Sequence, residues 1–159
     1  MFRELFNIAP DAMVAVDGQG RIVRANAQAE RLFGYEPGTL SGSPIEMLMP
    51  DRVRKTHQRH VTHYAAMPRI RPMGAGQELV GQRRDGSEFP VEIALSPINT
   101  GEGMLYVAAI RDISESQRAR QALVRARHDK AMAQMGQLML AAPNLDKAIE
   151  SLPGLIGAA

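Results

Sequence analysis

Three histidines lie three residues apart in the middle of the sequence, at His57, His60 and His63. On a helix this spacing keeps His57 and His60 near one face, while His63 lies further around. A zinc site would need a further Cys, Asp or Glu, and the neighbouring sequence offers no obvious one. A single histidine can instead be the axial ligand of a haem iron. The group therefore predicts no metal cluster and leaves single-histidine chemistry open.

Catalytic groups of other kinds do not form a pattern. An enzyme needs a nucleophile with a base, paired carboxylates or a phosphate-binding loop. Glu88 and Glu92 share the solvated face of a predicted strand. The Gly74-Ala75-Gly76 stretch is too short for a phosphate loop and no helix follows it. We therefore expect that this chain is not an enzyme.

Composition narrows the remaining classes of protein. The chain has 159 residues, enough for one domain with a tail, and no Cys, which excludes disulfides, thiolate ligands and cysteine adducts with a flavin. It lacks a signal-peptide pattern and any apolar run of membrane-spanning length. The formal net charge is only +2. We expect a cytoplasmic protein without direct membrane contact.

Nucleic-acid binding is an alternative of another class. It would depend on five basic residues scattered around the predicted C-terminal helix: Arg118, Arg120, Arg125, Arg127 and Lys130. Their interleaving with Ala and Gln favours a solvated face over a phosphate-binding one. We expect no nucleic-acid partner.

A hairpin between Leu79 and Leu95 is the element around which the fold is organised. Asp85-Gly86 lies between two strand-like runs, which is a strong signal for a tight turn. After the turn, apolar residues alternate with others at Phe89, Val91, Ile93 and Leu95. This period of two predicts one apolar strand face that packs against a helix or lines a cavity.

The other elements follow from similar local signals. We expect strands over 12–17, 21–25 and 104–110, a short N-terminal helix that ends at Pro10, a helical turn over 45–48 and a helix over 51–66. Asn26 is predicted to cap a helix that ends at Phe33, with Gly34 as its left-handed terminator.

A long helix is predicted to start at Ser114, with Gln117 completing a capping box, and to end by Ala142 because Pro143-Asn144 breaks the chain. Alternating spacings of four and three residues give this helix a short seam of the coiled-coil type, which with the N-terminal helix predicts a homodimer. The seam consists of Val124, His128, Ala131, Met135 and Leu138. We expect three segments: a domain over 1–113, a linker helix over 114–142, and the start of a following module over 143–159.

The order of these motifs resembles the PAS family. The resemblance is carried by Phe6-Asn7-Ile8-Ala9-Pro10-Asp11-Ala12, Leu32-Phe33-Gly34-Tyr35, Leu48-Met49-Pro50, Arg83-Arg84-Asp85-Gly86 and Arg111-Asp112-Ile113-Ser114. It implies an α+β PAS fold, in which short helices cover one face of a five-stranded antiparallel sheet and a long exit helix follows.

The resemblance to the PAS family also implies a function, namely a sensory or dimerisation module that detects a small ligand, cofactor state or partner. The exit helix would relay the signal, with Asp112 and Ser114 at the junction. The effector, in the same protein, would be a histidine kinase or diguanylate cyclase, and the tail over 143–159 resembles the opening helix of a GAF domain.

Between Leu48 and Pro90 the chain is similar to the haem-binding PAS domains of oxygen-sensing kinases. This resemblance implies that His57 is the axial ligand of a haem, and that Ile93 and Leu95 line its gas side. Gln77 stands where those sensors have a distal arginine, which is a departure from their pattern. A haem-based gas or redox sensor is therefore an alternative to a module whose ligand the sequence leaves unidentified.

Overall fold

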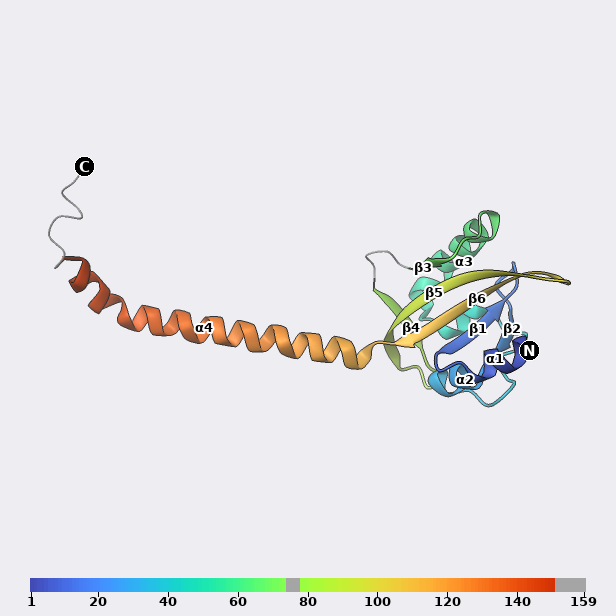
Figure 1. Ribbon diagram of the computed structural model, residues 1–159, viewed down its shortest axis with the longest axis horizontal. Coiled ribbons are helices and arrows are strands. Elements are labelled where there is room, and N and C mark those ends of the chain that lie inside the picture. Colours follow the sequence, from blue (N-terminus) through green and yellow to red (C-terminus); the bar gives the residue numbers. More distant parts are fainter. Residues whose placement is uncertain (74–77, 151–159) are drawn as a thin grey trace. The chain divides into compact units, whose positions relative to one another are not determined.

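The computed structural model describes residues 1–73 and 78–150 (Figure 1). In chain order its elements are α1 (Phe2–Ile8), β1 (Ala12–Val16), β2 (Ile22–Ala25), α2 (Ala27–Phe33), the 3-10 helix η1 (Ile45–Leu48), α3 (Asp51–Ala66), β3 (Arg71–Pro72), β4 (Leu79–Gln82), β5 (Glu88–Thr100), β6 (Gly103–Asp112) and α4 (Ser114–Glu150). The elements expected from the sequence are present, and apart from the end of α4 most of their bounds differ from the expected ones by a few residues.

The strands form one antiparallel sheet in the order β2-β1-β6-β5, with β3 and β4 both paired to β5 at the far edge. The sheet is therefore five strands wide, as the PAS resemblance implied, and its last edge is divided into two short strands. β1 at the N-terminus pairs with β6, Val14 lying opposite Ala108, so the two ends of the domain meet in the centre of the sheet. This pairing places the start of α4 next to the central strands.

The β4–β5 hairpin confirms the expected turn at Asp85-Gly86. Gln82 lies opposite Glu88, and the Gly86 amide donates to the Arg83 carbonyl over 2.9 Å. Gly86 has a φ of +86°, which a residue without Cβ adopts at no steric cost. The Asp85 carboxylate accepts hydrogen bonds from the amide and hydroxyl of Ser87. A three-residue turn with a left-handed Gly matches the twist of the flanking strands.

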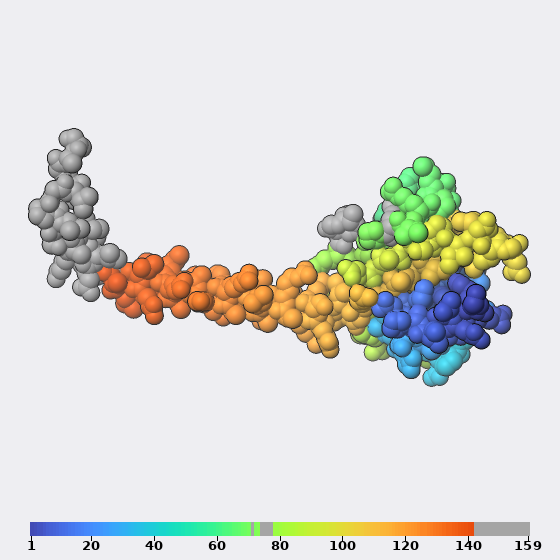
Figure 2. Space-filling model, in the orientation of Figure 1, coloured from blue at the N-terminus to red at the C-terminus, as the bar shows by residue number. Residues whose placement is uncertain are grey.

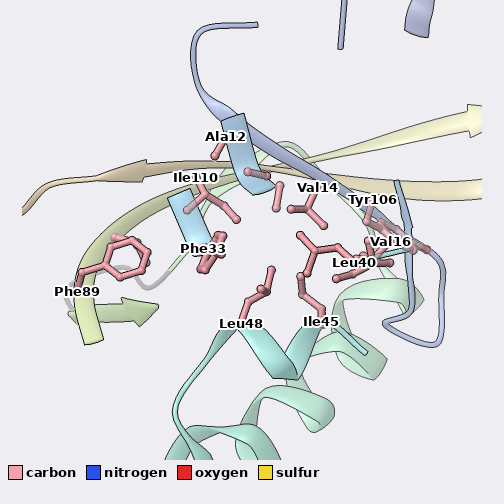
Figure 3. Close-up of a cluster of buried hydrophobic side chains, with 14 of the residues drawn as sticks. Ala12, Val14, Val16, Phe33, Leu40, Ile45, Leu48, Phe89, Tyr106 and Ile110 are labelled. Atoms are coloured by element: carbon pink, nitrogen blue, oxygen red, sulfur yellow. The ribbon is translucent and has the colours of Figure 1, made fainter. Parts of the chain in front are cut away.

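The main core lies between one face of the sheet and the segment from α2 to α3. Figure 3 shows Val14, Phe89 and Ile110 of the sheet in the same cluster as Ile45 and Leu48 of η1. The alternation of strand side chains sends the neighbouring residues to the other face. There α1 packs through Phe6 against Ala15 and Val107, so one helix covers the opposite face.

Asn26 and Gly34 end α2 as expected. The Asn26 side chain accepts a hydrogen bond from the Ala29 amide over 2.9 Å, and Gly34 has a φ of +77°. These two ends hold α2 in a position where Ala29 and Phe33 are buried.

The chain divides into two compact units, Met1–Glu115 and a second that begins at Ser116. α4 does not end at Pro143, as the sequence predicted, but continues to Glu150. A proline removes one helical hydrogen bond and crowds the preceding turn, but the neighbouring Leu, Met and Ala residues favour the helix strongly. The expected break at Pro143-Asn144 is therefore wrong.

Candidate functional site

His57 lies on the inward face of α3. Arg54, His57 and Val61 are half-buried on this helix and Tyr64 is buried, and their spacings of three and four residues place them on one side. The His57 side chain is 18% exposed. His60 and His63 are exposed, so the structure does not bring the three histidines together.

Glu46 is the partner of His57 that the sequence did not reveal. Its Oε1 lies 3.1 Å from His57 Nδ1, and its side chain is only 10% exposed. Glu46 comes from η1, where it lies between the buried residue Ile45 and the half-buried Met47. The polar residue within an apolar helical turn is the signal that reasoning from sequence could have used, because a buried carboxylate requires a partner.

This pair has a defined chemical capacity. A ligating histidine usually donates its second ring N–H to a carboxylate or carbonyl, which orients the ring and fixes the tautomer. When the Glu46 carboxylate holds Nδ1–H, Nε2 of His57 keeps a lone pair that can bind a metal. Among the described residues no group of three His, Asp or Glu side chains could hold a metal ion by itself. The His57–Glu46 pair offers one metal ligand, the Nε2 atom of His57.

Two of the other residues expected near a cofactor are on β5. Ile93 and Leu95 are partly buried and pack against the main core, on the same strand face as Phe89 and Val91. Gln77 lies outside the described residues. Ile93 and Leu95 thus pack against the same hydrophobic cluster as Ile45, the residue that precedes Glu46 in η1.

Asp112 and Ser114, the expected relay residues, contact each other directly. Asp112 Oδ1 accepts hydrogen bonds from the Ser114 amide over 2.8 Å and from the Ser114 hydroxyl over 2.5 Å. The predicted capping box, in which Ser114 pairs with Gln117, is therefore wrong. Ser114 is the first residue of α4, and the side chain two residues before it caps the helix instead.

Arg83 connects this junction to the rest of the domain. Its Nη2 lies 3.1 Å from Asp112 Oδ2, its Nε donates to the Leu32 carbonyl at 3.2 Å, and its guanidinium carbon lies 4.0 Å above the centre of the Phe89 ring. One side chain thus contacts α2, the hairpin and the residue that caps α4. Sequence reasoning missed this role because the partners are 51 and 29 positions away.

Comparison with known proteins identifies this architecture. The family model described as a PAS domain matches residues 10–115. The chain belongs to the PAS family. It is a PAS sensory domain similar to those of sensor kinases.

Two curated relatives are sensors by name. The PAS domain is 31% identical over 115 residues to the sensor protein FixL of Bradyrhizobium diazoefficiens, covering 72% of this chain and 23% of FixL. It is 28% identical over 119 residues to the oxygen sensor protein DosP of Escherichia coli, covering 72% of this chain and 15% of DosP. The chain therefore spans less than a quarter of the length of either relative.

A solved structure agrees with this assignment. The PAS domain of an HTR-like protein from Haloarcula marismortui superposes with a TM-score of 0.57 at 26% identity, covering 70% of this chain and 94% of that one. Over the part of the chain that the structure describes, no helix is long and apolar enough to cross a membrane.

Surface charge pairs surround the hairpin of the PAS domain. Arg52 of α3 lies 2.7 Å from Glu88 of β5, and this hydrogen bond lowers the pKa of Glu88 and raises that of Arg52. The Ser87 hydroxyl, and then its amide, lower the pKa of Asp85 in the turn. Near the C-terminal end of β6, a hydrogen bond to Asp11 raises the pKa of Arg111. All four groups are ionised at neutral pH.

Proposed function

We propose that this PAS domain is the sensory and dimerisation module of a longer signalling protein, in which α4 relays its state to an effector. The effector would be of the histidine kinase or diguanylate cyclase type. Support comes from the sensors FixL and DosP and from the cell-division control histidine kinase PdhS of Brucella abortus, which is 24% identical over 131 residues. The chain spans 12% of PdhS, so the effector is part of the proposal.

One observation carries the proposal, namely the double contact of Asp112. One carboxylate oxygen caps the first residue of α4, and the other binds Arg83 of the hairpin. A small ligand that packs against Ile93 and Leu95 would displace β5, whose Phe89 lies under the Arg83 guanidinium. Movement of Arg83 would then change the capping of α4.

Dimerisation is supported by apolar side chains that the described residues leave uncovered. Phe2, Leu5 and Ile8 of α1 are exposed, although Phe6 of the same helix is buried. On α4 the apolar seam residues are exposed as well: Val124, Ala131, Met135 and Leu138. A second copy of the chain would bury both sets.

The relay is testable in a chimera in which the whole chain precedes the catalytic core of a histidine kinase. Asp112→Asn keeps the size of the side chain and removes its charge, whereas Asp17→Asn makes the same change in the β1–β2 turn, where Asp17 accepts from the amides of Gln19 and Arg21. We expect Asp112→Asn to change the basal rate of autophosphorylation and Asp17→Asn to leave it unaltered. Equal rates in both variants and the parent would contradict the relay.

Haem is the second candidate, favoured by the pairing of His57 with Glu46. The donor set fits an axial ligand, because Nδ1 is engaged and Nε2 is the nitrogen left for iron. A bound haem would supply an iron that binds a diatomic gas. His57 would hold the iron, Glu46 would orient the imidazole, and Ile93 and Leu95 would provide an apolar surface on the sheet.

The hypothesis of haem binding is tested by the absorption spectrum of the purified protein before and after addition of haemin. His60→Ala is the matched control for His57→Ala, since His60 lies on the same helix and is exposed. A sharp haem band that is lost only in His57→Ala would support this candidate. Absence of a band in the wild type after reconstitution would end it and leave the sensory proposal, with another ligand, in place.

A further inference from the structure

Positive charge is concentrated in the segment from Arg52 to Met73, which contains all of α3 except its first residue, Asp51. This segment holds six of the 19 Lys and Arg residues and none of the 17 Asp and Glu residues. The remainder of the chain carries 13 basic and 17 acidic residues and is therefore net negative. The net charge of the whole chain is low because the basic segment over 52–73 is balanced by the acidic residues elsewhere.

Part of this charge is neutralised within the domain and part is not. Arg52 pairs with Glu88 and Arg54 with Asp51. Lys55 and Arg59 lie on the outer face of α3, are exposed, and make no ion pair with any described residue. Like charges four residues apart destabilise a helix slightly, and a bound anion would remove that cost.

Two large apolar side chains are exposed at the end of the same helix. Met67 and Ile70 are each 79% exposed, and Arg69 lies between them in the sequence. This short segment is held against the helix end, because the Met67 amide donates to the Tyr64 carbonyl over 3.2 Å and the Tyr64 hydroxyl donates to the Arg69 carbonyl. In Figure 2 the segment that contains α3, coloured green, stands out at one edge of the domain.

We propose that this region is a peripheral docking surface for an anionic lipid bilayer. The surface, here called the α3 surface, consists of Lys55, Arg59, Met67, Arg69 and Ile70. The three cations would attract anionic headgroups, and the two apolar side chains would enter the boundary between headgroups and acyl chains.

Two features favour lipid over nucleic acid as the partner. Exposed Met and Ile side chains gain from an acyl environment, whereas single-stranded nucleic acid is bound by aromatic stacking as well as charge. The five residues of the α3 surface include no aromatic side chain.

The sequence predicted no direct membrane contact because it lacks a spanning segment, but a peripheral docking surface does not need a spanning segment. The proposal does not depend on the ligand of the sensory core.

The test is co-sedimentation of the full chain with vesicles of phosphatidylcholine alone or mixed with phosphatidylglycerol. We expect binding to the anionic vesicles only. Lys55→Gln, Arg59→Gln and Arg69→Gln together should weaken it about a hundredfold, since each cation near an anionic surface contributes a factor of about five. Met67→Ser with Ile70→Ser should also weaken it, at unchanged charge. Thermal melting of each variant shows whether it is folded.

The matched control removes one Lys and two Arg from α4, as Arg118→Gln, Arg125→Gln and Lys130→Gln. Retained binding in this control would assign the effect to the α3 surface. An equal loss in the control would mean that only net charge matters, and would overturn the proposal. It would also be overturned if the wild type ignored anionic vesicles, or bound a single-stranded oligonucleotide in their place.

Discussion

Arg83 and Asp112 are joined by an ion pair of 3.1 Å that links the β4–β5 hairpin to the residue capping α4. Both side chains are about one-third exposed, so the pair is neither a fully solvated contact nor a buried one. Its geometry is reinforced because Arg83 also stacks on Phe89 and donates to the Leu32 carbonyl. The junction between domain and helix is therefore held by several contacts of a single side chain.

Replacing Arg83 by Gln should lower the free energy of unfolding by about 1–3 kcal/mol, because it removes a charged hydrogen bond and a cation–π contact. Urea denaturation of the full chain measures this change. The control is Arg84→Gln, whose side chain is exposed and which should change stability by less than about 0.5 kcal/mol. Equal losses in the two variants would show that Arg83 acts only through net charge.

Asn26→Ala should be more damaging, at about 3 kcal/mol or more. The buried Asn26 side chain accepts from the amides of Met13 and Ala29 and donates to the carbonyls of Phe6 and Asp11, each at 2.9 or 3.0 Å. Alanine leaves all four backbone groups, two of them fully buried, without this partner. Asn7→Ala, at an exposed position of α1, is the control and should be nearly neutral by the same urea assay. A small loss for Asn26→Ala would mean that water replaces the amide.

The difference between Asn26 and Glu46 explains which parts of the site the sequence could predict. Asn26 caps the helix that follows it, and Gly86 is part of a tight turn. Both roles can be predicted from the residue types at neighbouring positions. The period of two in β5 likewise placed Ile93 and Leu95 on the inner face of the sheet. Local chemistry therefore predicted the elements and their faces.

Contacts between elements that are far apart in the sequence could not be predicted in this way. The contact of Glu46 with His57 depends on how η1 lies against α3, and that of Arg83 with Asp112 on the meeting of hairpin and β6. At Pro143 the local signal was present but the helical preference of its neighbours outweighed it.

Gly81→Ala should destabilise the sheet because the backbone of β4 lies close to two aromatic rings. A Cβ at this position would lie 3.0 Å from Phe89 and 3.2 Å from Phe33, closer than side chains normally pack. We expect a loss of about 1–3 kcal/mol as the rings shift. Gly18→Ala adds the same methyl where no atom lies within 4 Å, and it should be nearly neutral in thermal melting. A loss of similar size at both sites would contradict crowding by the rings as its cause, since the lower entropy of the unfolded chain with Ala by itself favours folding.

The acid side of the stability curve should depend on Asp85 and Glu88. Their pKa values are lowered in the folded state, so each carboxylate stabilises the fold above its ordinary pKa, 3.8 for Asp85 and 4.5 for Glu88. This contribution is lost as the pH falls through the lowered values. Ser87→Ala should raise the pKa of Asp85 alone, and Arg52→Gln that of Glu88 alone. Carbon-detected NMR titration of the carboxyl groups measures both, and each variant is the control for the other. If neither pKa moved, the hydrogen bonds would not cause the shifts.

The seam of α4 makes dimerisation sensitive to the face on which a charge is introduced. Val124→Arg with Leu138→Arg places cations on the apolar stripe, where each buried Val or Leu side chain would contribute about 1.5–3 kcal/mol to association. Leu140 is also exposed but lies on the opposite side of the helix, two residues from Leu138. Sedimentation velocity should therefore give a monomer for the double variant and a dimer for both Leu140→Arg and the wild type. A wild type that stays monomeric at high concentration would contradict the dimer itself. Dissociation by Leu140→Arg would instead show that the copies associate through a different face of α4.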